Sequence, residues 1–235
     1  MLIHLLELRR RSIQTLVWFG VLFTLFFFLA NDLFHVLINP LLHSLSGQKI
    51  VIATQITSPV FTPLKLAADA AMLFSAPFAL FQLWRFISPG LYKNEQQLLR
   101  GILTLSLILF IMGVLFCFYL VLPFMFQFFT HAVPKGVRYM PDIASAMDFI
   151  TRMLLLFGFC FQVPLICFIL VQLNILDVVT LKKVRPYVIV GSFIMGMLLT
   201  PPDVFSQIML AVPLCLLYEL GIILAVTMRR EYIIP

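Results

Sequence analysis

The sequence predicts an all-α integral membrane protein with six transmembrane helices, and three observations lead to this fold class. Of the 235 residues, 62% are hydrophobic and only 11% are charged, which is too little charge to cover a soluble domain of this length. The mean hydropathy is +1.08. The apolar residues gather in long runs, and about 20 apolar residues in a helix cross a bilayer. We therefore expect one polytopic membrane domain over residues 1–235.

Six apolar runs define the expected spans. They lie at residues 13–30, 64–84, 102–129, 147–173, 188–200 and 204–228. The first run follows a short basic segment, but no small-residue cleavage site comes after it, so we interpret it as a retained span. Between the first two runs, the stretch NDLFHVLINPLLHSL has apolar residues at helical spacing and is expected to lie along the membrane interface. Pro59 and Pro63 are then expected to break the chain before the second span.

The distribution of basic residues predicts the orientation. If the N-terminus is in the cytoplasm, 11 of the 16 Lys and Arg residues fall in cytoplasmic segments. This bias is the one that membrane proteins show. An even number of spans then places both termini in the cytoplasm.

The last two spans are expected to be short, because only TPPD separates them and the fifth has about 13 residues, which cover about 20 Å as a helix. Such a span either tilts into a recess or thins the bilayer around it. Pro186 before it and Pro201 after it are expected to prevent its extension.

Proline also lies inside four of the other spans, at Pro77, Pro123, Pro164 and Pro213. Prolines are common in membrane helices and need no special explanation there. Each one nevertheless favours a kink. Four kinks beside one short helix favour a concave bundle.

Two pairs of charged residues inside the spans have a local explanation. Asp69 follows Lys65 by four residues, and Arg152 follows Asp148 by four residues. Residues at this spacing lie on the same face of a helix, so each pair is expected to form a local ion pair.

Gln162 and Glu219 have no partner of opposite charge at three or four residues on the same helix. For Gln162, a structural hydrogen bond to another helix and a contact with a ligand remain equally open. We expect Glu219 to serve a function or an assembly contact, because a carboxyl at this depth needs a proton, water or a protein partner. A carrier for a small solute, with these two residues as its site, is one alternative function.

Motifs of enzymes are missing from the sequence. There is no nucleotide-binding phosphate loop, no HExxH and no GxSxG, and the four histidines lie outside the expected spans. The four cysteines lie inside apolar runs and are interpreted as packing residues. We therefore expect no enzyme activity, no cofactor, no metal site and no nucleic-acid partner.

Four stretches together resemble the TatC family, the multispanning signal receptors of the twin-arginine protein translocase. They are HLLELRRR before the first span, SPVFTPLKL before the second, FISPGLYKNE after the second, and KKVRPYVIVGSFIMGMLLTPPDVFSQ around the fifth. The similarity runs over nearly the whole chain in the expected order. It implies six spans with both termini in the cytoplasm of a bacterial inner membrane.

The resemblance also implies a function. Such a receptor binds signal peptides that carry an arginine pair and helps to move folded proteins across the membrane, using the proton-motive force. Its implied partners are the single-span subunits TatA and TatB, the cargo signal peptides and membrane lipid, within a larger complex in which the chain forms a homo-oligomer.

The family's signal-binding positions match Glu7, Arg9, Phe86, Pro89, Tyr92 and Glu95 of this chain. Positions important to family function also match Pro40 in the outer loop and Pro202 and Asp203 in the TPPD turn, and we interpret these three as structural. Many members carry a glutamate where this chain has Gln162. An amide cannot titrate, which counts against an obligatory proton-carrying role there.

Two carboxylates facing two arginines are the chemistry that we expect. A guanidinium can donate two parallel hydrogen bonds to a carboxylate, whereas an ammonium cannot form that fork. Glu7 and Glu95 stand at the cytoplasmic ends of the first two spans, so the fold could bring them together. The other interpretation of Glu7 is an ion pair with Arg10 or Arg11 on its own helix. The basic residues of this face are expected to contact anionic lipid headgroups.

Overall fold

The computed structural model describes residues 2–44, 51–87, 96–134, 140–173, 175–200 and 204–231. Five of the predicted site residues lie outside the described residues, namely Pro89, Tyr92, Glu95, Pro202 and Asp203. Phe86 lies in the last turn of a helix, but its side chain is outside the described part.

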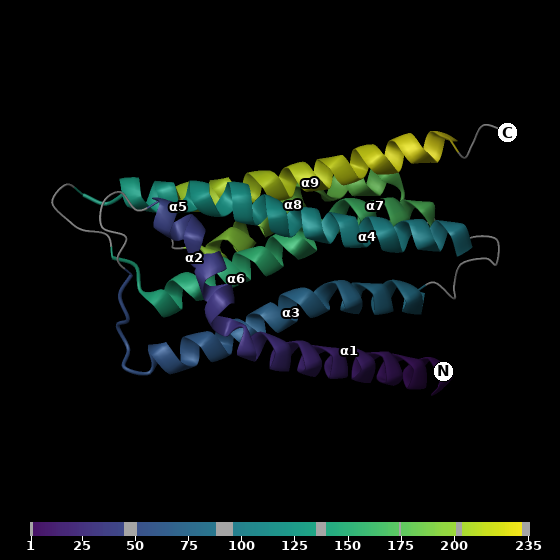
Figure 1. Ribbon diagram of the computed structural model, residues 1–235. Helices are drawn as coiled ribbons and strands as arrows, with labels where there is room; N and C mark the ends of the chain where they lie inside the picture. Colours follow the sequence, from purple (N-terminus) through teal and green to yellow (C-terminus); the bar gives the residue numbers. More distant parts are fainter. Residues whose placement is uncertain are drawn as a thin grey trace. The chain divides into compact units, whose positions relative to one another are not determined.

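The regular secondary structure of the described residues is helical, as the sequence predicts (Figure 1). Its elements are α1 (Leu2–Phe28), α2 (Ala30–Ser44), α3 (Ser58–Ile87), α4 (Gln96–Phe116), the π-helix η3 (Cys117–Val121), α5 (Leu122–His131), α6 (Ile143–Cys160), α7 (Val163–Gln172), α8 (Val178–Leu199) and α9 (Val204–Glu231). In the described ranges, β-structure is limited to a single isolated bridge between Ile52 and Asp142.

Five helical stretches in the described part are long and apolar enough to cross a membrane. They are Arg9–Phe28, Ser58–Gln82, Gly101–His131, Ile143–Gln172 and Val204–Thr227. These five match the first four and the last of the predicted spans. The remaining predicted span belongs to α8, whose first half carries Lys182, Lys183 and Arg185. A six-span topology therefore stays a prediction.

The prolines act differently from one another. Pro123 lies in the first turn of α5, directly after the π-helix η3, and Pro164 lies in the first turn of α7, directly after the interruption that ends α6. A proline has no N–H for the carbonyl four residues earlier, which explains why the regular ladder changes before these two residues. By contrast, α3 and α9 continue without interruption through Pro77 and Pro213.

The expectation that prolines break the chain before the second and fifth spans is wrong, whereas α8 does end at Leu199, just before Pro201. α3 begins at Ser58, so that Pro59 occupies its first turn and Pro63 lies inside it. α8 is 22 residues long and includes Pro186. Packing explains this outcome, because the Tyr218 hydroxyl donates a buried hydrogen bond of 2.8 Å to the carbonyl of Leu181 on the first turns of α8. Tertiary contacts of this kind offset the roughly 3 kcal/mol that an interior proline costs.

The predicted helix lengths at the C-terminal end also need correction. Since α8 has 22 residues and α9 has 28, neither helix is short. Only the apolar part of α8, residues 187–199, is as short as the sequence suggested. The N-terminal part of α8, before this apolar stretch, contains the basic residues Lys182, Lys183 and Arg185.

The chain divides into two compact units. The first comprises residues 1–108 and 114–155, and the second comprises residues 109–113 and 156–235. In the first unit, α1 and α3 run side by side (Figure 1), and the ring centroids of Phe26 and Phe74 lie 4.9 Å apart between them. The helix predicted between the first two spans is present as α2, and it packs on α3 and α5.

The core of the second unit joins α7, α8 and α9. Its buried residues are Cys167, Val171, Leu181, Tyr218, Ile222 and Ala225. Two glycines of this unit lie where helices approach closely. A Cβ on Gly221 would lie 3.0 Å from the Cα of Pro164, and one on Gly113 would lie 2.5 Å from the carbonyl oxygen of Phe157. Small residues at such crossings let membrane helices pack backbone to backbone.

Candidate functional site

Glu7 forms an ion pair with Arg11 on the same helix. The Arg11 Nη2 donates a short hydrogen bond to Oε1 of Glu7, four residues earlier on α1. The Glu7 side chain remains 35% exposed, whereas that of Arg11 is only 14% exposed. This is the local pairing that the sequence offered as the other interpretation of Glu7.

Arg11 also fixes α1 to the end of α3. Its Nη1 donates a hydrogen bond of 3.0 Å to the carbonyl oxygen of Gln82, which lies one to two turns before α3 ends at Ile87. The side chain of Gln82 is buried, and its Nε2 donates a 3.3 Å hydrogen bond to Oε1 of Gln14. Arg11 and the two glutamines thus hold the N-terminal half of α1 beside the last turns of α3.

The other predicted signal-binding residues are less completely described. Arg9 is exposed on α1, and Phe86 lies one residue before the end of α3. Glu95, the second expected carboxylate, is outside the described residues together with Pro89 and Tyr92. A Glu7–Glu95 acceptor pair therefore stays a prediction, and the arrangement at Gln82 is the described part of the site.

Pro40 lies inside α2, with its side chain buried, and its carbonyl accepts a hydrogen bond of 2.8 Å from Ser44 Oγ. The structural interpretation of Pro40 stays a prediction.

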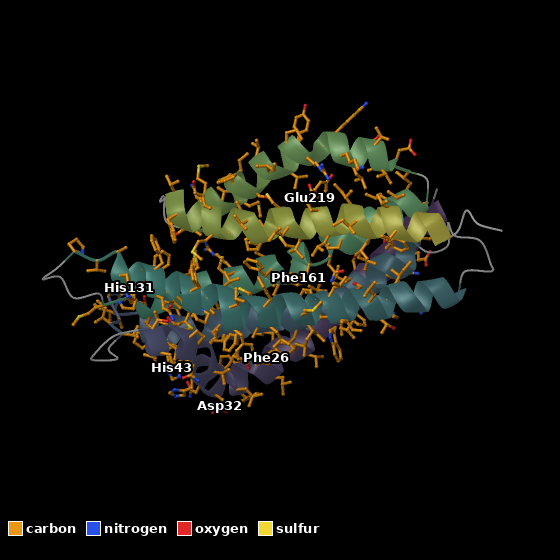
Figure 2. All side chains as sticks on the ribbon, turned by 90° about the horizontal axis from the view of Figure 1, so that it is seen from above. Phe26, Asp32, His43, His131, Phe161 and Glu219 are labelled. Atoms are coloured by element: carbon orange, nitrogen blue, oxygen red, sulfur yellow. The ribbon has the colours of Figure 1, made fainter. Side chains whose placement is uncertain are left out.

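The two intramembrane polar residues have different surroundings. Gln162 is only 2% exposed and stands directly before α7, where its carbonyl accepts a backbone hydrogen bond of 2.9 Å from Ile166. Glu219 lies on α9 with its side chain directed to α8 (Figure 2), and its Oε2 accepts a 2.6 Å hydrogen bond from Nη2 of Arg185. Gln162 does not line the cavity beside Glu219, so the two do not form one solute site there.

Charged residues near the start of α6 pair across helices. The predicted Lys65–Asp69 pair is wrong, because Lys65 Nζ instead contacts Oδ2 of Asp148 at 2.5 Å. Asp69 accepts a hydrogen bond of 2.9 Å from the hydroxyl of Thr151. The predicted Asp148–Arg152 pair is present but long, at 3.9 Å. The spacing of residues along one helix could not predict these contacts, because each joins a residue of α3 to a residue of α6.

A carboxylate at the start of α6 joins two distant segments. Asp142 accepts hydrogen bonds from the backbone N–H and the hydroxyl of Thr54, at 3.0 and 2.8 Å. It also accepts bonds from the N–H and hydroxyl of Ser145, both at 3.0 Å. These donors, the Thr54 N–H first among them, hold the pKa of Asp142 well below its usual value. Asp142 is the N-terminal cap of α6 and at the same time ties residues 51–57 to it.

Sequence reasoning missed most of these contacts between distant segments, and two of them show why. The link from Arg11 to Gln82 involves a backbone carbonyl, and side-chain patterns contain no signal for it. The Arg185–Glu219 pair did leave a signal, because the two residues lie at nearly equal distances along the chain from the TPPD turn. A hairpin of two antiparallel helices brings such positions side by side.

The fold and these contacts define an all-helical integral membrane protein whose polar residues join helices to each other. No group of three or more His, Cys, Asp or Glu side chains that could hold a metal ion is present within the described ranges.

Comparison with known proteins identifies the family. Residues 3–213 match the family described as Sec-independent protein translocase protein (TatC). The TatC protein of Haemophilus influenzae is 44% identical over 94% of this chain and 87% of its own length. That of Escherichia coli K12 is 42% identical over 93% of this chain and 85% of its own length. The chain belongs to the TatC family, whose members are protein translocase components and not enzymes.

The fold agrees with this assignment. A crystal structure of the twin-arginine translocase receptor TatC matches with a TM-score of 0.85 and 31% sequence identity. The match covers 94% of this chain and 97% of that one.

Proposed function

We propose that this chain is the signal receptor and core subunit of a twin-arginine translocase in a bacterial cytoplasmic membrane. It binds the arginine pair of a signal peptide through Glu7 and Glu95 and helps to move the folded cargo across the membrane. Arg9, Phe86, Pro89 and Tyr92 complete the binding surface, and Pro40, Pro202 and Asp203 support the outer side.

The observation that carries this proposal is the position of Glu7. Arg11 holds its carboxylate on α1 while also contacting Gln82 on α3. α3 ends five residues after Gln82, and Glu95 follows eight residues later in the sequence. A carboxylate fixed in this way meets a ligand with little loss of conformational freedom, which favours binding.

Arg11 does not exhaust the acceptor capacity of Glu7. An ionised carboxylate has two oxygens and can accept about four hydrogen bonds. Arg11 occupies Oε1, and among the described residues no hydrogen bond goes to Oε2. A signal arginine can therefore bind the second oxygen without displacing Arg11, or form a fork by replacing it.

The wider assembly follows from the same proposal. Both termini face the cytoplasm, and the chain works with TatA and TatB in a complex that contains more than one copy of it. The proton-motive force drives transport. Because Gln162 is a buried amide, it contributes hydrogen bonds and no proton step.

Binding of a signal peptide to the purified chain in detergent tests this function. We expect a peptide with an Arg-Arg pair to bind at least tenfold more tightly than its Lys-Lys counterpart, because only arginine forms the bidentate contact. Glu95→Ala and Glu7→Ala should each remove most of that preference. Glu231→Ala removes a carboxylate from the end of α9 and serves as the matched control, which should bind like the wild type.

Equal binding of the two peptides to a folded chain would count against the receptor chemistry. A preference that persists in both glutamate variants would place the arginine contact elsewhere.

A further inference from the structure

The second unit contains an apolar cavity between α8 and α9. It has a volume of about 310 Å³, at the lower end of the range of small-molecule sites. Its walls are mainly aliphatic and aromatic, with Ile189 and Phe193 from α8 and Val212 and Leu216 from α9. Arg185 and Glu219 lie together at one end. The cavity thus has an apolar body and a single charged end.

Arg185 retains an unused hydrogen-bond donor at this end. Its Nη2 binds Glu219, but its Nε is buried and has no hydrogen-bond partner among the described residues. A buried donor without an acceptor is unfavourable, so an acceptor oxygen placed there would bind well. Guanidinium donors suit the oxygens of phosphate in particular.

The charged end carries more positive than negative charge. Lys182 precedes Arg185 by three residues and the cavity-lining Ile189 by seven, so it lies on the same face of α8. Its side chain is exposed. The negative charge of Glu219 neutralises the positive charge of Arg185, so the positive charge of Lys182 is left to attract an anion. Lys183, also exposed, lies on the other side of the helix.

From these observations we propose that the cavity between α8 and α9 binds one anionic phospholipid. The phosphate accepts hydrogen bonds from Arg185 Nε and from Lys182, and an acyl chain fills the apolar body. A small soluble anion would leave the apolar walls without a partner, whereas a lipid satisfies both ends at once. The site goes beyond the proposed signal binding, because it involves none of the residues of α1 or α3.

Native mass spectrometry of the purified full-length chain tests this site directly. The chain is presented with phosphatidylglycerol or phosphatidylcholine at equal concentration, and the bound fraction is read from the mass. We expect phosphatidylglycerol to bind about tenfold more tightly. Arg185→Gln should abolish the preference, and Lys182→Gln should reduce it about fivefold, as expected for one basic residue near a lipid phosphate.

Matched variants separate the site from general surface charge. Lys183→Gln removes the same charge from the other side of α8 and should leave the preference unchanged. Cys215→Phe places a ring at a cavity-lining position and should lower the binding of phosphatidylglycerol without altering the charge. Lys182 is exposed, so its substitution remains informative if Arg185→Gln does not fold.

Several results would overturn the proposal. Equal binding of the two lipids would do so, as would equal losses in Lys182→Gln and Lys183→Gln. If the wild type instead forms a lipid-free dimer, and Cys215→Phe abolishes that dimer, the cavity would be assigned to a second copy of the chain. Loss of a co-purified single-span subunit in Arg185→Gln, with lipid binding unchanged, would assign it to a protein helix. No signal peptide is present in these measurements, so they succeed or fail independently of the proposed receptor function.

Discussion

Substitution of Gly113 by alanine should destabilise the protein, whereas the same change at Gly101 should not. Both glycines lie in α4. At Gly113 an added Cβ would be 2.5 Å from the carbonyl oxygen of Phe157 and 2.9 Å from the Cβ of Phe161. At Gly101 nothing lies within 4 Å of an added Cβ.

The magnitude follows from what has to move. The nearest atom to the new methyl group is a backbone oxygen, which cannot rotate away, so the two helix segments must separate by about half an ångström to one ångström. Overpacking of this kind costs about 1–3 kcal/mol. At Gly101 the substitution instead gains helix propensity, worth up to about 1 kcal/mol. The two variants should therefore differ by about 2–4 kcal/mol in the free energy of unfolding.

This difference in the free energy of unfolding can be measured on the purified chain in mixed detergent micelles. Circular dichroism follows the loss of helix as the fraction of denaturing detergent increases. Wild type and both variants are compared under identical conditions, with reversibility established first. If Gly113→Ala is as stable as Gly101→Ala, the close approach at Phe157 does not exist as described. The reasoning about small residues at this crossing would then be wrong.

Three further variants have expected outcomes. In equilibrium unfolding, the Asp142→Asn variant should lose less stability than the wild type when the pH falls from 5 to 3. The pKa of Asp142 is lower in the folded than in the unfolded protein. Its carboxylate therefore stabilises the fold above the unfolded-state pKa, and this stabilisation is lost as the pH falls toward the folded-state pKa. In the same variant, amide exchange at Thr54, one of the donors to Asp142, should accelerate; unchanged exchange would contradict the contact. Tyr218→Phe should lower the free energy of unfolding by about 1 kcal/mol, since the carbonyl of Leu181 loses a buried donor, and a neutral effect would show that this bond does not hold α8. Insertion of one helical turn into residues 187–199 should impair transport in membrane vesicles but leave signal-peptide binding intact, because the short apolar part of α8 is expected to thin the bilayer; full transport by the longer helix would exclude thinning.

The helices themselves were largely predictable, because hydropathy and helical spacing are properties of contiguous residues. The apolar runs identified the five membrane-capable stretches, and the pattern of NDLFHVLINPLLHSL identified α2. Helix ends were less predictable. Pro186 has the local signature of a boundary, but α8 continues through it because α9 supplies packing and a hydrogen bond.

Polar partners were the least predictable feature. Spacing within one helix correctly suggested Glu7 with Arg11 and Asp148 with Arg152. It failed for Lys65, whose partner comes from α6, and it gave no partner for Glu219. The reason is physical: the interior of a membrane offers no water, so charged side chains pair with whichever helix lies nearest, however distant in sequence.

The contact between Thr54 and Asp142 also constrains the order in which the chain can be completed during its synthesis. The two residues are 88 positions apart. At 5 to 20 residues per second, the ribosome adds Asp142 about 4 to 18 seconds after Thr54. Throughout that interval residues 51–57 lack the carboxylate that holds them in the finished protein. The contact between Thr54 and Asp142 therefore forms late in biogenesis. It can form only when both residues lie on the same side of the membrane.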